Sequence, residues 1–249
     1  MELDFMFFAV AIPAVLYAGI DKAGFGSAAS VAAAAILALI LEPAEAVAIM
    51  LPLLIVMDFV ALRPNWKRWD PVAARVMLTG TTIGAFVGAA LIFVVSSELF
   101  RLLIGAIALI FVFFQFARRS GWISGLKPFS RPVGILFAIG AGVTSFIAHA
   151  GGPVASIYLL SRDMTKEQYQ ATTIVTFWVN NLIKIVLYVW LGILSLQTTV
   201  AAAYLLPFAV IGTYLGVRLN RIVPEKLYFT LIYVFLTIAG TKLIFDALA

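Results

Sequence analysis

The sequence has no cysteine, a single histidine, and few charges: only 12% of its 249 residues are charged. Without cysteine there is no disulfide, no thiol nucleophile and no thiolate ligand for a metal ion. Soluble domains typically carry about 25% charged residues. The sequence therefore argues against an ordinary soluble domain, a disulfide framework and a cysteine-based metal centre.

What the chain has in excess is apolar residues, at 63% with a mean hydropathy of +1.09. Apolar runs approach the roughly 20 residues that cross the hydrocarbon core. Period-2 alternation is absent, so the backbone has to be satisfied within helices. The acidic start at Glu2 and Asp4 does not fit a signal peptide, and we expect the first run to be retained. This predicts an all-α polytopic membrane protein with segments at about 5–20, 25–41, 45–62, 73–95, 99–116, 132–147, 153–161, 169–191, 200–217 and 226–246.

The first two segments of each half are short and are separated by glycine-containing breaks, at residues 23–27 and 148–153. Hydropathy leaves open whether each pair makes two full spans or a hairpin of half-helices. Basic residues in short loops mark the cytoplasmic side. Counted with an even number of crossings per pair, one side collects Arg63, Lys67, Arg68, Arg75, Arg118, Arg119, Lys127, Arg131, Arg162, Lys166, Arg218, Arg221 and Lys226. We therefore expect both termini outside and the loops 63–73 and 117–131 in the cytoplasm.

The two halves also resemble each other in sequence. Gly84 and Gly88 correspond to Gly212 and Gly216, an offset of 128 residues. The small-xxx-small spacing predicts close helix packing at both pairs. Five traverses per half is an odd number, so the second half should be inverted relative to the first, as in many secondary transporters. The expected division is a first repeat at 1–120, a cytoplasmic linker at 121–131 and a second repeat at 132–249, each repeat a broken helix pair plus three transmembrane helices.

Several stretches, taken in order, resemble the sulfite exporter TauE/SafE family. They are Gly24-Phe25-Gly26-Ser27, the basic loop from Arg63 to Asp70, Gly151-Gly152-Pro153, the run from Thr172 to Lys184, and the stretch from Pro207 to Leu219. The resemblance covers essentially the whole chain. It implies a membrane permease for sulfur-containing anions such as sulfite or organosulfonates. The sequence departs from the family pattern at Ser27, where a glycine is common, and at His149, where a small residue is more usual.

The two breaks are the first candidates for a substrate site. Gly151 and Gly152 precede a proline, which is favoured at the first position of a helix. A helix N-terminus inside the membrane presents unpaired N–H groups and partial positive charge, which suits an anion. Gly24, Phe25, Gly26 and Ser27 should present a second N-terminus from the other half. The alternative is a plain interhelical turn in which glycine serves packing.

Polar residues within apolar segments are the second group of candidates. Lys184 is costly near the bilayer centre. It should be the cation of an anion pocket, part of a structural pair with Asp58, or a side chain whose charged head snorkels to the membrane interface. Asn180 and Asn181 share its helix face, where they bind the anion or join helices. Asp58 is expected to pair with Arg63 at the end of its segment or to carry a proton. The imidazole of His149 suits proton coupling, because its ordinary pKa is near neutral. The alternative is a structural histidine that fills space and forms hydrogen bonds. Lys22, at the first break, is a possible second cation.

These features favour a secondary transporter in the inner membrane that exports sulfite or an organosulfonate and is coupled to protons, with a passive anion channel as the alternative. There is no phosphate-binding loop for ATP and no nucleophile-and-base arrangement for catalysis. We expect no enzyme activity, no cofactor and no metal. The expected partners are a small anion and membrane lipid, with a homodimer left open and no nucleic acid.

Overall fold

A computed structural model describes residues 3–24, 29–92, 96–122, 128–219 and 225–248. Within these ranges the chain forms ten α-helices and one short 3-10 helix, with no strand. The helices are α1 (Phe5–Gly24), α2 (Ala29–Leu37), α3 (Pro43–Leu62), η1 (Arg63–Asn65), α4 (Pro71–Ile92), α5 (Ser97–Arg119), α6 (Arg131–Ala148), α7 (Gly151–Leu160), α8 (Lys166–Trp190), α9 (Leu196–Leu219) and α10 (Glu225–Leu248). The expected all-helical fold and its segmentation are confirmed.

Helix length separates full spans from half-spans. Seven helices among the described residues are long and apolar enough to cross a membrane, namely α1, α3, α4, α5, α6, α8 and α9. By contrast α2 has nine residues and α7 has ten, which at 1.5 Å per residue is roughly half of the ~30 Å hydrocarbon thickness. Each broken pair is therefore a long helix followed by a half-length helix that cannot cross alone.

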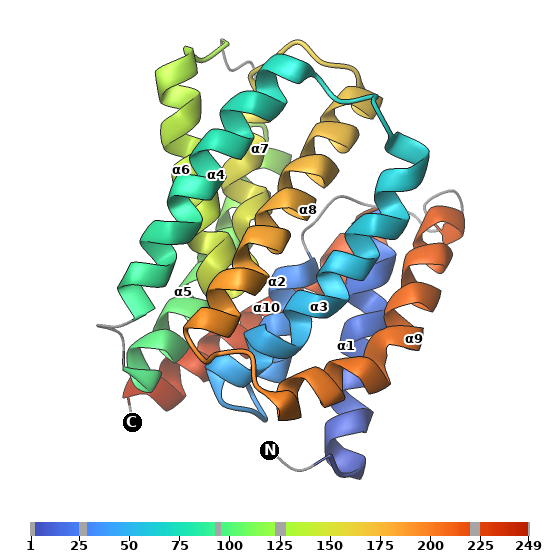
Figure 1. Cartoon of the computed structure of the whole chain (residues 1–249), viewed down its shortest axis with the longest axis vertical. Helices are drawn as coiled ribbons and strands as arrows, with labels where there is room; N and C mark the ends of the chain where they lie inside the picture. Colours follow the sequence, from blue (N-terminus) through green and yellow to red (C-terminus); the bar gives the residue numbers. More distant parts are fainter. Residues whose placement is uncertain (1–2, 25–28, 93–95, 123–127, 220–224, 249) are drawn as a thin grey trace.

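The chain termini and two of the basic loops lie at opposite ends of the bundle. Both chain termini lie at one end, at the bottom of the view in Figure 1. The connections from α3 to α4 and from α7 to α8 lie at the opposite end. This agrees with the arrangement that the basic loops predict. Which end faces the cytoplasm remains a prediction.

The glycines predicted to serve packing sit where helices touch. A Cβ at Gly212 of α9 would lie 2.5 Å from the carbonyl oxygen of Leu16 in α1, and one at Gly88 of α4 would lie 2.7 Å from Phe146 in α6. Gly84 abuts the α6 backbone and Gly216 the α1 backbone in the same way. Only hydrogen fits at these contacts. The packing role of all four glycines is confirmed.

The helix pairs follow a common pattern in the two halves. Helix α1 packs on α9, and its expected counterpart α6 packs on α4. Helix α5 packs on α10, and α3 on α8. An inverted repeat predicts these pairings, since exchanging the halves converts the first pair into the second. The repeat itself, and its division at residues 120 and 132, remain predictions.

Helices α3 and α8 form the centre of the bundle. About 67% of the α3 span and 61% of the α8 span are buried, against 44% or less of the other spans. Helices α1 and α2 of the first broken pair pack on α3, and α7 of the second broken pair packs on α8. Polar side chains on α3 and α8 are thereby held away from lipid, which decides where a site can form.

Candidate functional site

Among the residues that the structure describes, two lysine side chains are buried at the centre of the bundle. Lys184 of α8 is 0% exposed and Lys22 of α1 is 6% exposed. An ammonium group inside a membrane is tolerated only with polar or charged partners. The partners found here come from both halves of the chain.

Lys184 is held by a cluster of groups on α6 and α8. Its Nζ lies 2.7 Å from the carbonyl oxygen of Ser145 and 3.2 Å from the Ser145 hydroxyl. It also donates to Asn181 Oδ1 at 3.2 Å and lies 2.8 Å from His149 Nδ1. These contacts replace the water that the ammonium loses. Lys184 does not reach the lipid interface, so the alternative of a snorkelled head is excluded.

His149 closes α6 in a left-handed conformation, with φ of 52°. Its Nε2 lies 2.9 Å from the carbonyl oxygen of Val47 in α3. A carbonyl only accepts, so Nε2 carries the hydrogen and Nδ1 is the acceptor for Lys184. The Ser30 hydroxyl of α2 donates to the backbone carbonyl of His149 at 3.1 Å. The histidine thus joins α2, α3 and α8 at the second break.

Asp58 pairs with Lys22, not with Arg63 as the sequence suggested. Its Oδ1 lies 2.8 Å from Lys22 Nζ, and its Oδ2 accepts from Asn181 Nδ2 at 2.8 Å. Asp58 is fully buried, whereas Arg63 is exposed. Five positions on a helix correspond to about 140° of rotation, so the two side chains leave α3 on different sides. The expected Asp58–Arg63 pair is wrong for this reason.

The two asparagines face inward with Lys184, as predicted. Asn181 bridges opposite charges: its amide nitrogen donates to Asp58 and its oxygen accepts from Lys184. Asn180 donates to the Ser145 hydroxyl at 3.0 Å. Its Oδ1 is buried and has no hydrogen-bond partner among the described residues. The pair therefore both joins helices and leaves an amide oxygen inside the site.

The second break presents the N-terminus of α7 to this cluster. Helix α7 begins at Gly151, and no side chain among the described residues caps it. The first turn of a helix has unpaired N–H groups and partial positive charge. A Cβ at Gly151 would lie 2.5 Å from Phe177 and 2.6 Å from the carbonyl oxygen of Ala141. Glycine is therefore required here for close approach.

The first break is described only in part. Gly24 is the last residue of α1, while Phe25, Gly26 and Ser27 lie outside the described residues. The predicted role of these three residues in the site remains a prediction. Lys22, two residues before the end of α1, places the end of this helix beside the cluster.

A small cavity lies beside Lys22 near the end of α1 and Gly152 at the start of α7. It is lined by Lys22, Ser30, Leu54, Ser145, His149, Gly152, Phe177 and Asn181. Its volume is about 10 Å³, about the space for one water molecule. The cavity is therefore too small for a polyatomic anion in this conformation.

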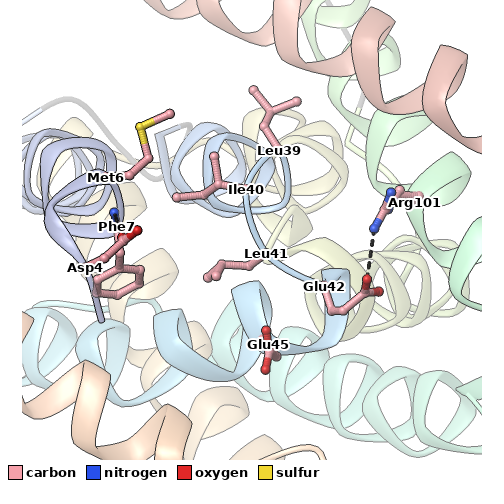
Figure 2. Close-up of a pocket in the computed structure, with 9 residues that line it drawn as sticks. All are labelled: Asp4, Met6, Phe7, Leu39, Ile40, Leu41, Glu42, Glu45 and Arg101. Carbon is pink, nitrogen blue, oxygen red and sulfur yellow. Dashed lines mark hydrogen bonds and ion pairs between the residues drawn. The ribbon is translucent and has the colours of Figure 1, made fainter. Parts of the chain in front are cut away.

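A larger pocket opens at the end of the bundle that carries the termini (Figure 2). Its volume is about 440 Å³, and it lies between the starts of α1, α3 and α5 and the turn from Leu39 to Glu42. Figure 2 shows Arg101 reaching Glu42, with 3.2 Å between the charged groups. Glu45 in its wall precedes Val47, the acceptor of His149, by two residues. The first turn of α3 thus separates this pocket from the buried site.

Ser145 and Lys22 are the site residues that sequence reasoning undervalued. Ser145 contacts both Lys184 and Asn180 and joins α6 to α8. A serine within the apolar run 132–147 was the available signal. Lys22 was recognised as a possible cation, but its partner Asp58 lies 36 positions away and could not be identified from spacing.

A multi-pass helical bundle with half-length helices and buried charges where its halves meet has the architecture of a membrane transporter. The model of the Sulfite exporter TauE/SafE family matches residues 11–243. The chain belongs to this family, whose members are membrane transporters of sulfur anions and not enzymes. It is a multi-pass membrane protein, and an inner-membrane location is consistent with this. No curated protein and no solved structure matches the chain.

Proposed function

We propose that this chain is a secondary transporter that exports sulfite or an organosulfonate across the inner membrane, with the anion bound between the two helix breaks. The observation that carries the proposal is the fully buried Lys184 next to His149 and the uncapped N-terminus of α7. A cation, N–H donors and amide groups at one place are the chemistry that recognises an oxyanion.

The contacts of the closed site support the following binding mode. The anion enters the cavity lined by Ser145 and Gly152 and accepts hydrogen bonds from Lys184 and from the first N–H groups of α7. Asn181 and Asn180 supply amide groups on the same helix face. At the first break, Gly24, Phe25, Gly26 and Ser27 supply the second helix N-terminus. Together these groups replace the hydration shell that a compact anion loses.

The closed cavity favours a transporter over a passive channel. A channel conducts through a continuous pore, whereas this site has room for about one water molecule and is sealed by the contacts of His149 and Ser30. We propose that the pocket lined by Glu42 and Arg101 is the outer end of the transport route, on the side of the termini. Alternating access then requires α2 or the turn at 39–42 to move away from α3.

Binding can be tested on the purified protein by thermal shift with sulfite, sulfate, taurine, isethionate, sulfoacetate and simple carboxylates. Specific binding raises the unfolding temperature by mass action. We expect a shift with sulfite or a sulfonate that is lost in Lys184→Met. Lys242→Met, an exposed lysine in an i,i+4 pair with Asp246, is the matched control. Equal shifts in both variants would exclude Lys184 from the anion site.

Transport in proteoliposomes separates the two mechanisms. A transporter exchanges labelled anion across the membrane when unlabelled anion is present on the other side, and its rate saturates. A channel shows no such counterflow. If the protein shows no counterflow but does show a unitary conductance in planar bilayers, it is a channel and the proposed function is contradicted.

A further inference from the structure

Lys22 and Asp58 already form, inside the protein, the kind of pair that a bound anion would form. Lys22 Nζ lies 2.8 Å from Asp58 Oδ1, and the side chains are 6% and 0% exposed. The second carboxylate oxygen accepts from Asn181, a residue that also lines the cavity. Lys22 lines the cavity too. The carboxylate thus engages one cation and one amide of the proposed anion site.

We infer that Asp58 is an internal counter-anion: the transported anion displaces it from Lys22, and Asp58 takes up one proton in the same step. The inference rests on the proposed function, because it concerns the same anion. It assigns Lys22 as a second substrate ligand and Asp58 as the proton carrier. The sequence alone left the proton to either Asp58 or His149.

A proton on Asp58 frees Lys22 for the anion without adding negative charge to the buried site. A singly charged anion entering beside Asp58 would place two negative charges on Lys22 in a medium where unpaired charge is costly. A proton from water that forms an O–H bond on Asp58 leaves the net charge of the site unchanged. Lys22 then pairs with the anion, and the neutral carboxyl group still accepts from Asn181. No bond in the anion is made or broken.

The surroundings of Asp58 allow this exchange. The charges acting on its carboxylate are Lys22 from α1 and Lys184 from α8. Asp21 lies next to Lys22 and is also buried. Helices α2, α5 and α9 and the 3-10 helix η1 also pack on α3. The site thus has two cations to hold an anion, and the Asp58 carboxylate is the group that has to release Lys22.

His149 is not placed to take the proton in this conformation. Its Nε2 donates to Val47, and its Nδ1 faces the Lys184 ammonium at 2.8 Å. A proton on Nδ1 would set two donors against each other. Asp58 has no such conflict, since a protonated carboxyl group can release Lys22 to the anion.

The consequence is co-transport of one proton with each singly charged anion. The loaded site carries the same net charge as the empty one, so crossing the membrane moves no net charge. The direction of transport then follows the combined gradients of anion and proton. Uptake of a proton on binding is the measurable signature.

The test is the affinity for isethionate, a sulfonate that stays singly charged, measured by calorimetry on the purified protein from about pH 5 to about pH 8. Linkage of one proton weakens binding by up to about tenfold per pH unit as pH rises. In Asp58→Asn we expect an affinity that no longer depends on pH. Asp246→Asn, a change of the same kind at an exposed pair, should keep the wild-type slope.

A second measurement needs no variant and covers the case in which Asp58→Asn does not fold. Titration of the wild type in two buffers of different ionisation enthalpy counts the protons taken up, and we expect about one per anion. Binding without proton uptake, or a pH slope that survives in Asp58→Asn, overturns the inference and leaves the proposed function standing. Failure of the wild type to bind sulfite or any sulfonate at all overturns the proposed function itself and this inference with it.

Discussion

The Lys184 ammonium nitrogen lies 2.8 Å from His149 Nδ1. His149 ends α6 in a left-handed backbone conformation, so this contact joins the charged group of α8 to the second break. The contact places the only imidazole of the chain against a buried positive charge. The backbone conformation at the second break therefore determines where the imidazole contacts the Lys184 ammonium group. Changes at either residue should therefore affect the anion site, but in distinguishable ways.

Replacing Lys184 should strongly weaken anion binding while the protein still folds. In Lys184→Met the apolar stem remains and the ammonium is lost, so we expect roughly a ten- to hundredfold loss of affinity for sulfite or a sulfonate. Affinity by calorimetry, with size-exclusion chromatography as the folding check, measures this. Normal transport by the variant, or recovery of function only when Asp58→Asn is added, would make the lysine part of a structural charge network.

Substitutions of His149 should change the stability of the protein through its left-handed backbone conformation as well as through loss of the imidazole ring. At φ of 52° a β-branched residue is strained, whereas glycine is not. We expect His149→Val to be less stable than His149→Gly by about 1–3 kcal/mol. Thermal unfolding in detergent compares the two directly. Equal stability would mean that the turn relaxes in the variants.

Glycine substitutions should separate packing from binding. A valine at Gly84 or Gly212 meets the backbone of a neighbouring helix, so its main effect should be a lower unfolding temperature. A valine at Gly152, which lines the cavity, should lower anion affinity more strongly. Measuring both quantities on each variant tests the assignment. A larger loss of affinity at Gly84 than at Gly152 would contradict it.

The orientation in the membrane can be tested by reporter fusions. The basic loops predict that residues 65–70, 120–127 and 219–222 are cytoplasmic and that both termini are outside. Cysteine accessibility labelling is a second test, since the chain contains no native cysteine. Termini found in the cytoplasm would reverse the orientation, and the pocket behind Glu42 and Arg101 would then open inward.

Much of the fold followed from the sequence, because each transmembrane helix must satisfy its backbone internally and cover itself with apolar side chains. That local requirement makes the helices readable as apolar runs, and the basic residues of the loops separate the two ends of the bundle. The sequence also predicted that Lys184 has buried partners, because an ammonium group within an apolar membrane segment is costly without them. The half-span character of α2 and α7 was not, since a run such as 25–41 continues through the turn that ends α2 at Leu37.

The tertiary structure decided which polar groups meet. Lys22 and Asp58 lie on different helices, as do Asn181 and Asp58, and Ser145 and Lys184. These contacts depend on how each helix is rotated about its axis, and packing against neighbours determines that rotation. Sequence analysis identified costly residues within the membrane. Only the packing of α1, α3, α6 and α8 showed that they form one connected network, because a buried charge is stabilised by whichever partner the folded chain places beside it.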